Sequence, residues 1–148
     1  MFKGILVLCT GNTCRSPIAE YMLKAATERH GLEVAIKSAG LGALAGQPAD
    51  PYAIKVARKH GLDIEPHRAR QLTEEHLQDC ELVLVMESWQ QAELELRYPF
   101  LRGRVYLLGK WNEKQIEDPY RKPIDAFEIT YADIEICIDL WCKKIWPK

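Results

Sequence analysis

Close to its amino terminus, the chain carries the sequence ILVLCTGNTCRSP at residues 5–17. The first five of these residues are apolar throughout, which indicates a strand buried on both faces. A helix is expected from about Pro17 to His30, because proline suits the first helical position and a glycine follows the end. Ser16 stands where its side chain can cap that helix. The stretch therefore predicts a strand, a short loop and a helix, the opening unit of an α/β sheet.

The rest of the chain repeats this alternation of short apolar runs with longer helical patterns. Three further strands are expected at residues 34–38, 82–86 and 104–108. Helices are expected at about 51–60 and 73–78. Another helix opens at Ser88, where Gln91 completes a capping box. This order predicts one domain over residues 1–148, an α/β fold with a four-stranded parallel sheet flanked by helices on both faces.

Large apolar side chains recur at steps of three and four in the C-terminal segment. They are Phe127, Tyr131, Ile134, Ile138, Trp141 and Ile145. This spacing places them on one face of a helix. An aromatic stripe of this kind belongs to a core more often than to a cofactor site, so we expect the helix to pack on the sheet.

Composition and charge exclude several classes of function. The 148 residues carry a formal net charge of −1, with no long run of one sign. That balance argues against a nucleic-acid surface, because phosphate backbones attract clustered lysine and arginine. The apolar run at the amino terminus is too short for a signal peptide or a membrane span, and no other run is long enough. We therefore expect a cytoplasmic protein that neither binds nucleic acid nor inserts into a membrane.

The five cysteines are an odd number, which indicates reduced thiols rather than a disulfide framework. A zinc site that uses Cys9, Cys14, Cys137 and Cys142 is conceivable. The spacing inside each pair exceeds that of most zinc knuckles, and the second pair would lie on a long helix. No metal or cofactor is therefore expected.

The loop between the first strand and the first helix suits a tetrahedral dianion. In an open parallel sheet, ligands bind beyond the carboxyl ends of the strands, where this loop lies. Because only five residues separate Cys9 from Arg15, the backbone N–H groups of residues 10–15 can point to one centre beside the helix N-terminus. Gly11 and Asn12 tolerate the left-handed backbone angles that a tight curl requires. The loop thus predicts a phosphate cradle.

Side chains of this loop indicate chemistry as well as binding. Arg15 can place its planar fork on two phosphate oxygens. Cys9 lies at the floor of the cradle, where the N–H groups, the helix dipole and Arg15 should hold it as a thiolate near neutral pH. The hydroxyl of Ser16 can donate to this sulfur and ease its departure in a second step, although capping alone is the simpler interpretation.

The simpler interpretation of Cys9 is a buried cysteine at a strand end, which is common. The spacing Cys-x5-Arg alone would not outweigh it. The combination of Gly, Asn, Arg, Ser and Pro with a strand–loop–helix setting makes chance a poor explanation. The loop does not match a nucleotide-binding P-loop, because no Gly-Lys-Ser/Thr follows the glycine.

The sequence at residues 9–16 resembles the phosphate loop of low-molecular-weight protein tyrosine phosphatases. The likeness extends through SAG at 38–40, HRARQ at 67–71 and DPY at 118–120, so it covers nearly the whole chain. Within the family, the resemblance is strongest to bacterial members that are paired with tyrosine autokinases governing capsule or exopolysaccharide export. The resemblance implies hydrolysis of phosphotyrosine in proteins through a phosphocysteine intermediate, with a cognate membrane tyrosine autokinase as the partner.

The same resemblance assigns roles to single residues. Cys9 is the nucleophile, and Arg15 binds the phosphate. Asp118 is the general acid, with Glu117 as the lesser candidate. The residues that contact the substrate are Thr10, Gly11, Asn12, Thr13, Cys14, Leu44 and Tyr120, and those that support the loop are Ser16, Ser38 and His67.

Two positions depart from the family pattern. Arg121 stands where many members carry a second aromatic residue after the tyrosine, and Leu44 stands where relatives often have an aromatic. Both departures change the rim of the cleft, and with it the choice of phosphoprotein. The resemblance also implies that Cys14 can trap oxidised Cys9 as a disulfide, with simple packing beneath the loop as the alternative.

Other functions share parts of this pattern. An arsenate reductase of the same fold would need relay cysteines at about residues 86–94, where the chain has none, and Cys80 precedes the third strand. A phosphotyrosine-binding module would lose the nucleophile or the acid, whereas Cys9 and Asp118 are both present. The sequence leaves open the oligomeric state, and whether docking to the kinase outweighs catalysis.

Overall fold

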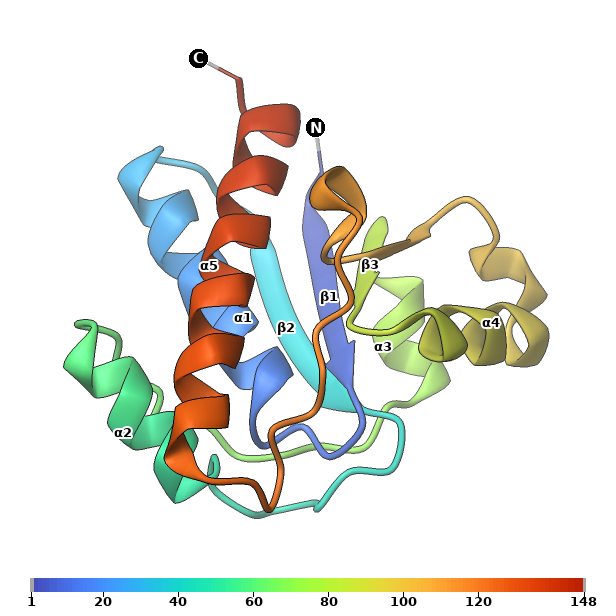
Figure 1. Cartoon of the computed structure of the whole chain (residues 1–148). Coiled ribbons are helices and arrows are strands. Elements are labelled where there is room, and N and C mark those ends of the chain that lie inside the picture. The colour runs from blue at the N-terminus through green and yellow to red at the C-terminus, as the bar shows by residue number, and fades with distance from the viewer. Residues whose placement is uncertain (1, 148) are drawn as a thin grey trace.

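The computed structural model describes residues 2–147. Within them, four strands form one parallel sheet in the order β2-β1-β3-β4 (Figure 1). The strands are β1 (Gly4–Cys9), β2 (Ala35–Gly40), β3 (Leu82–Val85) and β4 (Val105–Leu107). The α-helices are α1 (Arg15–Arg29), α2 (Pro51–Lys59), α3 (Glu74–Gln78), α4 (Ser88–Arg97) and α5 (Ile124–Ile145). The 3-10 helices η1 (Pro99–Leu101) and η2 (Lys110–Asn112) lie on either side of β4.

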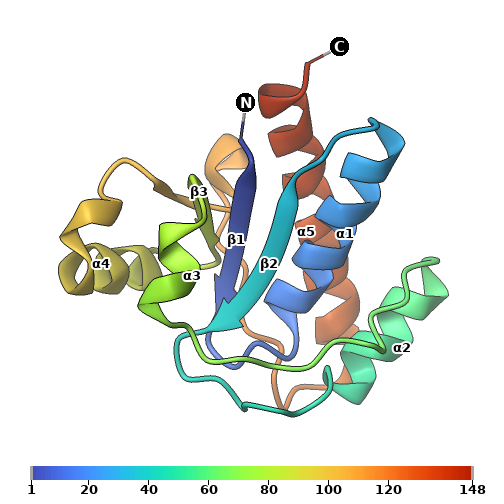
Figure 2. The same cartoon turned by 180° about the vertical axis from the view of Figure 1, so that it is seen from behind.

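Helices cover both faces of the sheet, as Figures 1 and 2 show from opposite sides. All of β1 is buried, and its alternate side chains enter different cores. Ile5 and Val7 belong to the core shared with α1, α2 and α5. Leu6 and Leu8 belong to the core shared with α3 and α4. The predicted α/β fold, a four-stranded parallel sheet between two layers of helices, is therefore confirmed.

The order of the strands places a crevice at one end of β1. This strand pairs with β2 along its whole length and with β3 on its other edge. The chain therefore adds β2 on one side of β1, and then adds β3 and β4 on the opposite side, so the direction of strand addition reverses at β1. Open parallel sheets bind ligands at such a reversal, beyond the carboxyl ends of the strands. The segment after β4 also reaches this end, because the N–H of Ile116 donates to the carbonyl of Met86, just beyond β3.

Helix α1 begins at Arg15, two residues before the expected start at Pro17. Cys14 is its N-cap residue and makes no capping hydrogen bond through its side chain. Ser16 lies inside the first turn, and its hydroxyl contacts the sulfur of Cys9. The prediction that Ser16 caps the helix is therefore wrong, because the preceding loop uses this hydroxyl.

The capping box of α4 forms one residue earlier than expected. The carboxylate of Glu87 accepts from the backbone N–H of Gln90, and the Gln90 side chain accepts from the N–H of Glu87 at 3.0 Å. The prediction of Ser88 and Gln91 is wrong by one position. Serine, threonine, aspartate and asparagine are the usual N-cap residues, so the sequence pattern favoured Ser88 over the longer Glu87.

The C-terminal stripe packs as predicted. Its members Phe127, Tyr131, Ile134, Ile138 and Trp141 are buried on α5, and Ile145 is half-buried. The indole N–H of Trp141 donates to the carbonyl of Leu108 at 2.8 Å, which fixes α5 against the segment after β4. No helix within residues 2–147 is both long enough and apolar enough to cross a lipid bilayer.

Candidate active site

A pocket of about 210 Å³ opens at the carboxyl end of β1. Three separate segments form its walls: the loop after β1, the loop after β2, and the segment between β4 and α5. The residues that line it are Cys9, Thr10, Gly11, Thr13, Cys14, Arg15, Gly42, Leu44, Asp118 and Tyr120. The structure thus brings together the side chains that the sequence singled out for catalysis and for contact with the substrate, apart from Asn12.

Asn12 holds the shape of the loop from behind the pocket. Its φ of 58° is left-handed, whereas Gly11 is not among the residues with positive φ. The amide nitrogen of Asn12 donates to Ser16 Oγ at 2.7 Å and to Ser38 Oγ at 2.9 Å, and its amide oxygen accepts from the N–H of Arg70 at 2.9 Å. The expected left-handed turn is therefore found at the asparagine alone, whose side chain ties the loop to α1, to β2 and to the segment that contains Arg70.

The sulfur of Cys9 lies 2.9 Å from the hydroxyl oxygen of Ser16, and both residues are buried. Because this hydroxyl oxygen already accepts from the amide of Asn12, its own hydrogen is free to point at the sulfur. The arrangement therefore provides Cys9 with a donor that can stabilise a negative charge on sulfur.

Buried groups behind the loop extend this network. His67 Nε2 lies 2.7 Å from the carbonyl oxygen of Asn12, and because a carbonyl can only accept, Nε2 carries the hydrogen. Burial lowers the pKa of His67 below its ordinary value, so the ring is neutral at pH 7. The hydroxyl of Ser38 donates to the buried carboxylate of Glu20, whose charge is balanced by Lys24 Nζ at 2.6 Å. Glu20 was missed by the sequence analysis, although it stands one helical turn after Ser16.

Arg15 is almost completely buried, and its guanidinium is held by groups from outside the loop. Its Nη1 donates to Glu87 Oε1 and to the carbonyl oxygen of Ile116, both at 2.7 Å. Its Nη2 lies 3.7 Å from Asp118 Oδ2. Glu87 was also missed by the sequence analysis. The signal was its place directly after β3, because carboxyl ends of parallel strands meet at one edge of the sheet.

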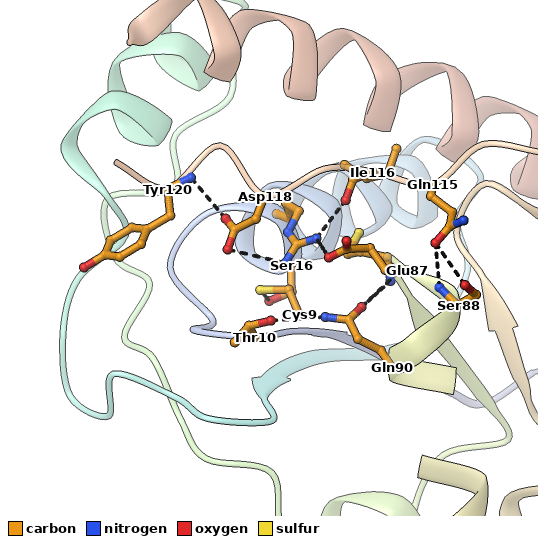
Figure 3. A network of polar contacts seen from close by, with 12 residues as sticks. Cys9, Thr10, Ser16, Glu87, Ser88, Gln90, Gln115, Ile116, Asp118 and Tyr120 are labelled. Carbon is orange, nitrogen blue, oxygen red and sulfur yellow. Dashed lines mark hydrogen bonds and ion pairs between the residues drawn. The ribbon is translucent and has the colours of Figure 1, made fainter. Parts of the chain in front are cut away.

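Helix α4 also supports the loop through a buried amide. The side-chain nitrogen of Gln90 donates to Thr10 Oγ1 at 3.3 Å (Figure 3). The side-chain oxygen of Gln90 accepts from the N–H of Met86 at 2.9 Å. This link joins the end of β3 to the first residue after Cys9. Gln90 was not recognised in the sequence, where it had no feature beyond its place at a helix start.

The segment from 117 to 122 places one of its two acidic residues in the pocket. Asp118 lines the pocket of Cys9, whereas Glu117 lines only a second, smaller hollow on the side of α5. Asp118 Oδ1 accepts from the N–H of Tyr120 at 3.1 Å, and the carbonyl of Pro119 accepts from the N–H of Lys122 at 2.9 Å. Two hydrogen bonds therefore fix this turn, and Asp118 is the carboxylate available to a bound ligand.

The remaining cysteines differ from Cys9 in their surroundings. Burial raises the pKa of Cys14, so this thiol stays protonated, and it lines the same pocket. Burial also raises the pKa of Cys80 to about 11. Cys80 lies beside Gly4, at the amino end of the sheet, so it could not relay electrons to Cys9. No three histidine, cysteine or acidic side chains gather as metal ligands among residues 2–147.

Comparison with known proteins assigns the chain to a family. The family model described as "Low molecular weight phosphotyrosine protein phosphatase" matches residues 4–148. The chain is 45% identical to the "Probable low molecular weight protein-tyrosine-phosphatase EpsP" of Ralstonia solanacearum over 145 residues, which are 98% of this chain and 97% of the relative.

Solved structures give the same result. The tyrosine phosphatase Wzb from Escherichia coli K30, in complex with sulphate, superposes with a TM-score of 0.92 at 40% identity, over 98% of this chain and 99% of that one. The YwlE arginine phosphatase from Geobacillus stearothermophilus superposes with a TM-score of 0.86 at 33% identity, over 96% of this chain and 92% of that one. The chain therefore belongs to the low molecular weight phosphotyrosine protein phosphatase family.

Proposed function

We propose that this chain hydrolyses phosphotyrosine in proteins, with Cys9 as nucleophile, Arg15 as phosphate ligand and Asp118 as general acid. One observation carries the proposal: the Cys9 sulfur, the Arg15 guanidinium and the Asp118 carboxylate line a single pocket. The hydroxyl of Ser16 lies 2.9 Å from that sulfur. A thiolate, a phosphate ligand and an acid in one pocket are the groups that phosphate-ester cleavage through a covalent intermediate requires.

In the first step, the phosphate lies in the N–H cradle of residues 10–15. Because Glu87 and Ile116 occupy both hydrogens of Arg15 Nη1, the N–H groups on Nε and Nη2 remain for two phosphate oxygens. The Cys9 thiolate attacks phosphorus, and the bond from phosphorus to the tyrosine oxygen breaks. Asp118 gives its proton to the departing oxygen, which leaves as neutral tyrosine.

In the second step, a water molecule attacks the phosphocysteine. Asp118, now a carboxylate, takes a proton from this water, and the bond between sulfur and phosphorus breaks. Cys9 leaves as a thiolate, whose charge the hydroxyl of Ser16 stabilises. Inorganic phosphate is released and the starting protonation states are restored. Most of the rate enhancement comes from groups already fixed in place before the substrate arrives.

The rim of the pocket suits an aromatic ring. Leu44 and Tyr120 both line the pocket, and each is roughly half exposed, so their apolar surfaces are available to a phenyl group. The resemblance to bacterial members of the family supports a cognate membrane tyrosine autokinase, one that controls capsule or exopolysaccharide production, as the substrate, with the cytoplasm as the site of action. Cys14 would protect oxidised Cys9 in that setting by forming a disulfide with it.

Hydrolysis of a phosphotyrosine peptide, without added metal and with a chelator present, tests the proposal. The wild-type protein is expected to release inorganic phosphate. A folded protein that releases none would overturn the proposal and favour a binding module.

A second candidate substrate is phosphoarginine, because one structural relative is an arginine phosphatase. A guanidinium group needs hydrogen-bond acceptors beside the phosphorus, and the Thr13 hydroxyl and Asp118 carboxylate line this pocket. A phosphoarginine peptide of the same sequence, assayed in parallel, separates the two. A higher kcat/KM for phosphoarginine would replace phosphotyrosine as the substrate.

Glu87 is expected to act as a positioning residue for Arg15. The Glu87→Ala variant loses the 2.7 Å contact to Nη1, and we expect kcat/KM to fall about tenfold, the usual effect of a lost hydrogen bond to a charged group. Glu87→Gln keeps an acceptor oxygen and should restore most of the activity. The variant Glu93→Ala, which removes a partly exposed carboxylate paired with Arg97 of the same helix, is the matched control. Wild-type kcat/KM in Glu87→Ala, or no recovery in Glu87→Gln, would contradict this role.

A further inference from the structure

Arg121 has an unusual backbone conformation at the rim of the pocket. Its φ of 65° is left-handed, as are those of the non-glycine residues Asn12 and Glu113. Asparagine adopts this region readily, but an arginine gains nothing from it because its Cβ crowds the following carbonyl. Strained conformations of this kind are retained mainly where the side chain has a use.

The side chain of Arg121 lies against the ring of Tyr120, on a turn fixed by two hydrogen bonds. The hydrogen bonds from the N–H of Tyr120 to Asp118 and from the N–H of Lys122 to Pro119 close the turn on both sides. The guanidinium carbon of Arg121 lies 5.3 Å from the centre of the Tyr120 ring. Since that ring lines the pocket, the cation is held beside the pocket mouth rather than free in solvent.

The charge of Arg121 is not neutralised within the described chain. No carboxylate oxygen in residues 2–147 lies within 4.0 Å of its guanidinium, and the residue is exposed. The charged residues that line the pocket, Arg15 and Asp118, face each other at 3.7 Å. Asp50, behind Thr13, is engaged as the N-cap of α2. Arg121 therefore presents, beside the pocket mouth, a guanidinium that forms no ion pair within residues 2–147.

We propose that Arg121 selects phosphotyrosine sites in which a neighbouring residue carries a carboxylate; the inference rests on the proposed function. Consecutive Cα atoms in a peptide lie about 3.8 Å apart, so the residue beside a bound phosphotyrosine passes the mouth of the pocket. A glutamate or aspartate there meets the free donors of Arg121, which the Tyr120 ring holds in place. The departure from the second aromatic residue of the family thus becomes a preference for acidic substrates.

Two phosphotyrosine peptides test this, identical except that glutamate or glutamine flanks the phosphotyrosine on both sides. For the wild type at low ionic strength, kcat/KM is expected to be about three- to tenfold higher for the glutamate peptide, the range of a partly exposed charged contact. Arg121→Gln should bring this ratio close to one, and Arg121→Glu should invert it. Arg121→Lys, which keeps the charge, should keep part of the preference.

A matched control and a small substrate complete the experiment. Arg102→Gln removes an exposed arginine that follows η1, and it should keep the wild-type ratio of the two peptides. A wild-type ratio near one, or an unchanged ratio in Arg121→Gln, would overturn the inference. If the wild type still hydrolyses the peptides and p-nitrophenyl phosphate in that case, the proposed function stands and only the inference about Arg121 falls. If it hydrolyses neither peptide nor this ester, both the inference and the proposed function fall.

Discussion

Replacing Cys9 by serine is expected to abolish hydrolysis of a phosphotyrosine peptide, with kcat lower by at least about 10⁴-fold, as for the loss of a nucleophile in other hydrolases. Serine keeps the approximate size of the side chain and its contact with Ser16. An alcohol is not ionised near neutral pH, however, so no anion would face the phosphorus. The peptide should still bind, because Arg15 and the N–H groups of residues 10–15 are unchanged. Phosphate release at high enzyme concentration measures the residual rate.

Two further measurements separate lost chemistry from lost structure. Calorimetric titration with the same peptide should show that Cys9→Ser binds it, and thermal unfolding should show a cooperative transition. Cys142→Ser, which changes a half-buried thiol on α5, is the matched control and should keep the wild-type kcat. Turnover by Cys9→Ser above the uncatalysed rate would rule out Cys9 as the nucleophile.

Asp118→Asn is expected to lower kcat for a phosphotyrosine peptide by about 10²- to 10⁴-fold, the usual contribution of a general acid. Asparagine keeps the shape of the side chain and can still accept from the N–H of Tyr120, but it has no proton to give. The loss should shrink for p-nitrophenyl phosphate, because its leaving group is stable as an anion. Initial rates for a series of aryl phosphates of graded leaving-group acidity measure this trend.

The graded series also distinguishes acid catalysis from a simple change of charge. Asp118 lies 3.7 Å from Arg15 Nη2, so its neutralisation alters the field at the phosphate for every substrate alike. Glu117→Gln removes the neighbouring charge on the other side of the segment and should leave the series unchanged. An equal loss across all leaving groups in Asp118→Asn would exclude the acid role.

The parts of the site that could be predicted are local in sequence. The apolar run of β1, the short spacing from Cys9 to Arg15 and the helix that follows all lie within one short segment, where chain geometry alone limits the outcome. Asp118 was recognised only through the family resemblance, because an Asp-Pro pair by itself indicates a turn. The start of α1 was misjudged for a related reason: the capping rule describes an isolated helix, and Ser16 is used by the loop instead.

The parts that could not be predicted depend on which strands are neighbours. Glu87 reaches Arg15 across 72 positions of sequence, and Ile116 reaches it across 101. Neither contact follows from periodicity or spacing. They require that β3 lies beside β1 and that the segment after β4 returns to the same end of the sheet. Glu20 and Gln90 could not be predicted for the same reason. Glutamate and glutamine are common on exposed helix surfaces, yet both of these side chains are buried in polar networks.

The central position of β1 in the sheet also determines when the phosphate-binding site can form during synthesis of the chain. This strand is the first to be synthesised, yet its second edge stays unpaired until β3 has been made. Loop-closure entropy must be overcome before such distant strands gain their hydrogen bonds, so topologies of this kind fold slowly. The guanidinium of Arg15 stays without its anchors during that interval, because both come from later segments. Competence to bind phosphate is therefore acquired only after the segment that follows β4 has been made and has returned to the end of β1.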